Sequence, residues 1–169
     1  GRNVTFAIAT GGGFVSPTSA TTDTAGRAAA RWTLGPLAGG NSLIATSSGF
    51  SVTFQATGNS AAATTLLSNS STSQNGTAGL PAGAPPSVRV TDANGNPVAG
   101  VSITFAVSGG GGSILPVTPI ATNASGIATL TQWVLGTVAG ANTVTASAAG
   151  LTPSQLTFTA TGAAGAAAQ

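Results

Sequence analysis

Few side chains in this sequence can take part in catalysis. The 169 residues include four arginines and two aspartates, and they contain no lysine, glutamate, histidine, cysteine or tyrosine. Nucleophilic and acid–base catalysis need a reactive group with a titratable partner close to it. The two carboxylates, Asp23 and Asp92, fall in different parts of the chain. We therefore predict no catalytic, cofactor-binding or metal-binding residue, and a protein that is not an enzyme and uses no cofactor.

The segment DANGN places oxygen-bearing side chains at alternate positions, as a calcium loop does. Asp92, Asn94 and Asn96 have this spacing. An EF-hand loop also needs glycine at its sixth position and a carboxylate at its twelfth, whereas here glycine is fourth and the twelfth residue is isoleucine. A tight turn is the stronger interpretation, because Asn-Gly tolerates positive φ and an aspartate accepts backbone N–H bonds. We predict a turn at Asp92, Asn94 and Gly95, with a weak calcium site as the alternative.

The two tryptophans, Trp32 and Trp133, allow a structural and a functional interpretation. An exposed indole ring is a stacking platform for a sugar, whereas a buried one anchors a core or covers a sheet edge. Both tryptophans occupy the same place in a repeated pattern, which favours structural anchors. The glycine runs 11–13 and 109–112 lack the lysine and helix of a phosphate-binding loop, so we predict flexible or bulged hairpins there.

The composition excludes two classes of partner. The chain is 41% hydrophobic and 4% charged, against about 25% charged in ordinary soluble proteins. A net charge of +2 forms no basic patch, so we predict no binding to nucleic acid. No apolar run is long enough for a membrane span. The absence of cysteine excludes disulfides and thiolate metal sites.

Much of the sequence occurs twice, with a period close to the length of one β-sandwich domain, about 100 residues. VTFAIATGGGFVSP at 4–17 aligns with ITFAVSGGGGSILP at 103–116. The segment 22–50 aligns with 122–151, so that Trp32 matches Trp133 after one inserted residue. The sequence therefore predicts two related units, and the first begins without a counterpart of VRVTDANGNPVA.

Apolar and polar residues alternate within each unit, which is typical of half-buried strands. In the second unit this pattern predicts an antiparallel sandwich with strands at 87–92, 101–108, 127–135, 142–148 and 154–162. No window has a helical apolar stripe, so the predicted fold class is all-β. The segment 59–74 is either a connection with a short first strand, AATTLL, or a disordered linker.

The motifs VTDANGNPV, the glycine-rich turn after TFAV, ASGIAT and the pattern around WVLGTVAGAN follow one another in a set order. In this order the sequence resembles the bacterial immunoglobulin-like domains of group 1, the tandem modules of invasin- and intimin-type surface proteins. The resemblance covers 62–162 fully and 1–58 without its first third. It implies an immunoglobulin-like β-sandwich and an extracellular or cell-surface location. It transfers no adhesion site, because the lectin-like tip of the best-known members is missing.

We accordingly expect three segments: 1–58 as a partial Ig-like repeat, 59–162 as a complete one, and 163–169 as a linker toward a further repeat. Three explanations for the incomplete first repeat stay open. The first strands belong to the chain upstream, or a neighbouring molecule supplies them by strand complementation or domain swapping, or the repeat has a reduced fold of its own.

The expected function is that of a non-enzymatic extracellular structural module, in which tandem repeats form a surface stalk or filament. The expected partners are other copies of the chain or adjacent Ig-like repeats, with host or environmental surface ligands as a second class. The alternative is an adhesin fragment that binds glycans or proteins through exposed loops.

Overall fold

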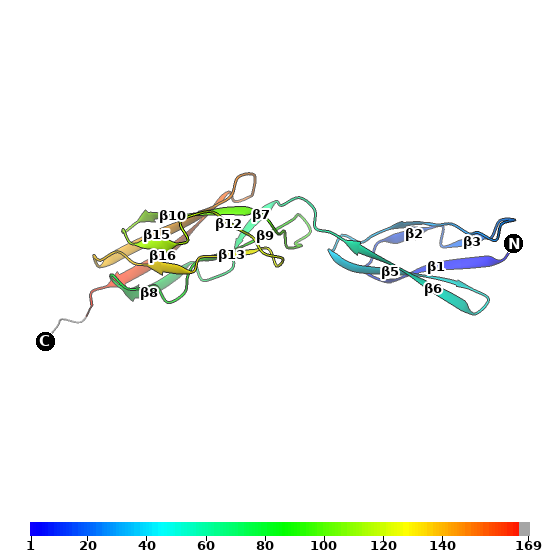
Figure 1. The fold of residues 1–169 in the computed structure, drawn as a ribbon, viewed down its shortest axis with the longest axis horizontal. Helices are drawn as coiled ribbons and strands as arrows, with labels where there is room; N and C mark the ends of the chain where they lie inside the picture. Colours follow the sequence, from blue (N-terminus) through cyan, green and yellow to red (C-terminus); the bar gives the residue numbers. More distant parts are fainter. Residues whose placement is uncertain (166–169) are drawn as a thin grey trace. The chain divides into compact units, whose positions relative to one another are not determined.

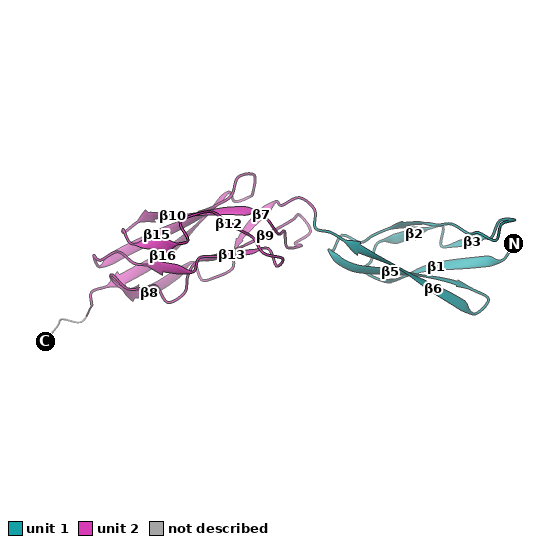
Figure 2. Ribbon diagram, viewed as in Figure 1, with its two compact units in different colours: residues 1–60 teal, residues 61–169 magenta. Residues whose placement is uncertain are grey.

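The computed structural model describes residues 1–165, and all the regular secondary structure in that range consists of β-strands. The chain divides into two compact units, Gly1–Ser60 and Ala61–Gln169 (Figures 1 and 2). The predicted all-β class is confirmed. Within the described residues no helix could cross a membrane. Most of the linker predicted at 163–169 lies outside the described residues.

The first unit contains six strands: β1 (Asn3–Thr10), β2 (Phe14–Ser16), β3 (Ser19–Thr21), β4 (Arg31–Thr33), β5 (Gly39–Ser47) and β6 (Phe50–Gly58). Four of them form an antiparallel sheet in the order β3-β1-β5-β6, and β2 pairs with β4 in a separate ribbon. Strand β6 is the last strand of the sheet, so its outer edge has no neighbouring strand among residues 1–165.

The described part of the second unit contains ten strands: β7 (Thr65–Ser68), β8 (Ser73–Thr77), β9 (Ser87–Thr91), β10 (Ser102–Gly109), β11 (Ser113–Leu115), β12 (Ile120–Ala121), β13 (Ile127–Thr129), β14 (Gln132–Val134), β15 (Gly140–Ser147) and β16 (Gln155–Ala163). They form a sheet in the order β12-β10-β15-β16-β8, a second sheet β13-β9-β7, and the ribbon β11-β14. Side chains from both sheets and from the ribbon meet in one core.

The alternation in the sequence explains how this core forms. Along β16 the side chains of Phe158 and Ala160 are buried, while Thr157, Thr159 and Thr161 between and beside them are exposed. Each large apolar side chain that folding buries in this way contributes about 1.5–3 kcal/mol to the free energy of folding. The second unit therefore has the two covered layers that a β-sandwich needs.

Three details differ from the sequence-based predictions. The predicted strand 127–135 is two strands, because the chain changes partners near the buried Leu130: β13 pairs with β9, and β14 pairs with β11. Strand β8 runs parallel to β16, so the sandwich is not wholly antiparallel. The alternative of a disordered linker at 59–74 is wrong, because that segment holds β7 and the start of β8.

The two units share six strands with matching registers. Phe6 pairs with Ala45 between β1 and β5, as Phe105 pairs with Ala146 between β10 and β15. Both strand pairs also shift register near their ends. The first unit has no counterpart of β7, β8 or β9. It also has no strand at 27–29, where the second unit has β13, because β13 is held by pairing with β9.

Candidate functional site

The predicted turn at Asp92 is a dense hydrogen-bonding centre. Its Oδ1 accepts the backbone N–H groups of Asn94 and Asn96, both at 2.9 Å. Its Oδ2 accepts the N–H of Ala61 at 2.8 Å and the side-chain amide of Asn96 at 2.9 Å. Asp92 itself is 2% exposed. The carboxylate thus ties the start of the second unit to the turn that follows β9.

These donors change the acidity of Asp92. The side-chain amide of Asn96, together with the backbone N–H groups of Ala61, Asn96 and Asn94, stabilises the charged form and lowers the pKa of Asp92 to about 2. Burial acts in the opposite direction and raises that pKa. Because all four polar contacts come from N–H donors, the carboxylate serves the turn, in which Gly95 takes a φ of 83°.

The same kind of turn occurs elsewhere with either acid or amide. Asp23 Oδ1 accepts the N–H groups of Ala25 and Arg27. Asn123, its counterpart in the second unit, accepts those of Ser125 and Ile127. The turn therefore needs an oxygen acceptor and not a charge. In residues 1–165 no group of three or more His, Cys, Asp or Glu side chains is placed to hold a metal ion.

The two tryptophans, which the repeat places in matching positions, have different surroundings. Trp133 is 1% exposed and lies in the core of the second unit. A ring buried in this way is not available to stack on a sugar. Trp32 is only partly buried and lines an apolar hollow. The buried indole Nε1 of each has no hydrogen-bond partner within the described protein.

The hollow beside Trp32 has a volume of about 290 Å³. The residues that line it all have apolar or aromatic side chains and come from the main sheet, from β4 and from the segment before β4: Phe6, Ala28, Ala29, Ala30, Trp32, Leu43 and Phe54. We call this lining, with the adjoining Val52 and Phe50 of β6, the open face. Apart from Trp32, sequence reasoning did not single out these residues, although the missing first strands were the signal that could have found the face.

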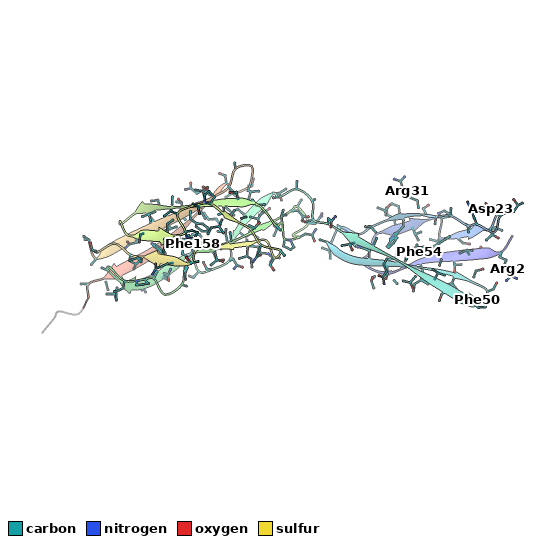
Figure 3. The ribbon with its side chains drawn as sticks, viewed as in Figure 1. Arg2, Asp23, Arg31, Phe50, Phe54 and Phe158 are labelled. Carbon is teal, nitrogen blue, oxygen red and sulfur yellow. The ribbon has the colours of Figure 1, made fainter. Side chains whose placement is uncertain are left out.

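Exposure on the open face is high for such large apolar side chains. Phe50, Val52 and Phe54 alternate along β6 and are 80%, 59% and 49% exposed. Phe158, the counterpart of Phe54 in β16, is 1% exposed. Figure 3 labels both side chains on their strands. The open face offers apolar area to be buried, and the outer edge of β6 beside it offers unpaired backbone groups. Such a site suits a polypeptide strand better than a small polar ligand.

Comparison with known families identifies the sandwich. Residues 84–164 match the bacterial Ig-like domain (group 1). This part of the chain belongs to that family. The match covers β9 to β16, so the motifs quoted above, from VTDANGNPV to WVLGTVAGAN, all lie inside the bacterial Ig-like domain. No curated protein sequence gave a match to the chain.

One solved structure supports the fold, and two others align with lower scores. InvD of Yersinia pseudotuberculosis aligns over 98% of this chain with a TM-score of 0.61 and 22% identity. Invasin, described as a bacterial integrin-binding protein, aligns over 98% with a TM-score of 0.46 and 20% identity. The D0-D1 domain of intimin aligns over 94% with a TM-score of 0.41 and 18% identity. The chain spans 48% of the InvD structure, 32% of the invasin structure and 78% of the intimin structure.

Proposed function

We propose that this chain is a non-enzymatic extracellular structural module, in which tandem Ig-like domains form part of a cell-surface stalk or filament. The observation that carries the proposal is the recurrence of one strand arrangement in both units, in one of which it is a bacterial Ig-like domain. Repeated domains of this kind extend a chain away from a surface without adding a new active site.

The use of the polar side chains supports the structural role. Asp92, Asp23 and Asn123 hold turns, and Asn142 Oδ1 accepts the N–H of Gly136 at 2.7 Å. Asn41 has the matching contact with Gly35 in the first unit, at 3.4 Å. These groups are committed to backbone geometry, and the outward strand positions carry mainly Thr and Ser in place of charged residues.

Exchange of strands between identical copies does not by itself explain a filament. The described residues hold two sheets of the same type, one centred on β5 and one on β15, and one covering segment, 61–98. If copies of these residues exchange that segment, each sheet that becomes covered leaves another uncovered. We therefore favour a stalk or filament of successive domains over polymerisation by segment exchange.

Adhesion is the second candidate function, and exposed apolar loop residues favour it. Leu37 and Val138 lie at matching positions in the loops before β5 and β15, and both are exposed. Val117, in the loop after β11, is exposed as well. Side chains of this kind at loop tips suit contact with a protein or glycan on another surface.

Antibody labelling of the cells that produce the natural protein tests the proposed location. Antibodies raised against residues 1–169 should label intact cells as strongly as permeabilised ones. Labelling that requires permeabilisation would contradict the proposal. For the adhesin alternative, the purified chain is compared with a Leu37→Ser, Val138→Ser variant for adherence to cells or immobilised glycans. Equal adherence of the two proteins would exclude the loops as the contact.

A further inference from the structure

We propose that the second unit carries tension, and that the parallel pair of strands β8 and β16 is the clamp that resists it. The inference rests on the proposed function, because a stalk is pulled along its chain whenever its far end is held. Four observations carry it: the direction of the two strands, the unbroken ladder between them, the anchors on their other sides, and the path by which the chain reaches β8.

The two strands of the clamp come from opposite ends of the second unit in sequence. Strand β8 (Ser73–Thr77) comes early and β16 (Gln155–Ala163) is the last described strand, yet they lie side by side and run in the same direction (Figure 1). Tension on the chain pulls β8 toward its amino end and β16 toward its carboxyl end. Because the strands are parallel, these pulls are opposite along the shared ladder, and the strands are loaded in shear.

Shear and peeling load the hydrogen bonds of a ladder differently. When two strands slide past each other, all the bonds between them are stretched together, whereas peeling from one end breaks the bonds one after another. The bonds of a parallel ladder are evenly spaced, which spreads a shear load over all of them. The pair β8 and β16 should therefore resist tension along the chain more strongly than it resists being peeled apart.

The ladder between β8 and β16 is continuous. It holds five residue pairs, beginning with Ser73 opposite Thr159, and has no shift in register. Further backbone bonds lie at both ends: the N–H of Thr159 donates to Thr72 O, and the N–H of Ala78 donates to Ala163 O, each at 2.8 Å. The Thr159 hydroxyl also donates to Thr72 O, at 3.1 Å. The load is therefore shared along the whole of β8.

Each strand of the clamp is also held on its other side. Strand β16 pairs with β15 over eight residues, and its Phe158 and Ala160 are buried in the core. Strand β8 is anchored by Gln74, whose Nε2 donates to Ala84 O at 2.8 Å and whose Oε1 accepts the N–H of Ala84 at 2.9 Å. The two strands therefore stay in place while the ladder between them is strained.

The chain reaches β8 along the same side of the sandwich. Strand β7, which precedes β8, carries Leu66, and this side chain is 1% exposed. Thr65 forms a parallel bridge with Thr152, ahead of β16, and the N–H of Thr152 donates to Thr64 O at 2.8 Å. Parallel contact thus begins ahead of β16 and continues to its end, so tension must shear this whole side before it opens the core.

Resistance to force is a separate property from equilibrium stability. Strand β8, SQNGT, has no large apolar side chain to bury. Its hydrogen bonds replace bonds to water, so each adds little net free energy to the folded state. Forced unfolding depends instead on the rate of unfolding, which is set by the bonds that must break first. The clamp can therefore be tested by changing the direction of the force while the stability stays the same.

The absence of cysteine from the chain makes this test direct, because thiol-linked DNA handles attach only where cysteine is introduced. One variant of the full chain, Asn59→Cys with Ala164→Cys, places handles at the two ends of the second unit and loads β8 and β16 in shear. The matched control, Thr72→Cys with Ser154→Cys, places both handles just ahead of the two strands and peels them apart. All four replaced side chains are exposed.

Optical tweezers measure the rate at which each variant unfolds at one common force. The shear variant should unfold more slowly than the peeling variant by about tenfold or more. The released length, about 3.3–3.6 Å for each residue between the handles, identifies the event as unfolding of the second unit. Urea unfolding, followed through the indole NMR signal of Trp133, should give the two variants the same stability.

Two results would overturn the proposal. One is unfolding in shear that is as fast as unfolding by peeling, or faster. The other is a difference in rate no larger than the urea stabilities of the two variants account for. Either result leaves the labelling of intact cells unaffected, so the clamp and the surface location are tested separately.

Discussion

Phe54 and Phe158 occupy the same position in two copies of one strand, and only Phe158 is enclosed by a second layer. Phe54 is 49% exposed and Phe158 is 1% exposed, so Phe158 contributes more to the stability of its unit. A buried phenylalanine loses its transfer free energy and leaves a cavity when it is truncated, whereas a half-exposed one loses little of either.

We expect Phe158→Ala to lower the free energy of unfolding of the second unit by about 3–5 kcal/mol. The matched change Phe54→Ala should lower that of the first unit by about 1 kcal/mol or less. Urea unfolding followed through the separate indole NMR signals of Trp32 and Trp133 measures the two units in one sample. Equal losses for the two variants would contradict the open face.

Asp92 makes the stability of the second unit depend on pH in the acid range. Its pKa is about 2 in the folded chain against an ordinary value of 3.8, so its contribution to stability is fully present above about pH 4. That contribution is lost as the pH falls through 4 toward 2, because protonation places a hydrogen on one carboxylate oxygen and removes the negative charge that the N–H donors stabilise. Asp92 is also the only acidic side chain in residues 61–169.

Thermal unfolding of the second unit should therefore occur at a nearly constant temperature down to about pH 4 and at lower temperatures below it. Asp92→Asn keeps an oxygen for the N–H groups of Asn94 and Asn96, as Asn123 does in its own turn, but it cannot titrate. The variant should be less stable at neutral pH and should lose most of the dependence between pH 4 and 2. An unchanged acid dependence in the variant would show that Asp92 is not its source.

At the scale of the elements, the glycine-rich loop after β10 is fixed by a close approach and is not a free hairpin. A side chain at Gly136 would overlap the carbonyl oxygen of Gly110, and Gly35 stands in the same relation to Gly11 in the first unit. The repeated glycine runs therefore let one loop lie against the backbone between β14 and β15.

Gly136→Ala should destabilise the second unit by about 1–3 kcal/mol, because backbone must move to admit the methyl group. Gly83→Ala is the matched control in the same unit, since its nearest neighbour, the end of the flexible Gln74 side chain, lies 3.8 Å from the new carbon. Denaturant titration of both variants checks the difference. If Gly83→Ala destabilises the unit as much as Gly136→Ala does, the loss of a glycine as such, and not the close approach, causes the destabilisation.

Alternation of apolar and polar residues was enough to predict most strands of the second unit, because each has one face in the core. The alternation did not predict features that depend on backbone hydrogen bonds at a sheet edge or on which strands pair. Strand β8, SQNGT, has no apolar alternation, since it lies at a sheet edge and is held by backbone bonds to β16. The break between β13 and β14 depends on which partner each strand meets, which the local sequence does not state. The missing first strands indicated an uncovered face, but which residues form it depends on the burial of matching positions in the two units.

At the scale of the whole chain, six strands are paired alike in the two units, and their sheet is covered by a second layer in the second unit but exposed on one face in the first. The difference is the segment 61–98, which supplies Leu66, Val88 and Val90 to one core and has no counterpart in the other. The stability of the two units should differ for this reason, although six of their strands are paired alike.

Hydrogen exchange at Gln55 and Thr159 in the unmodified chain tests this claim most directly. The N–H of Thr159 is bonded to β8, whereas Gln55 occupies the same position at an edge without a neighbouring strand. We predict slow exchange at Thr159, close to the rate set by global unfolding of the second unit, and fast exchange at Gln55. Slow exchange at both positions, in a chain that light scattering shows to be monomeric, would contradict the account.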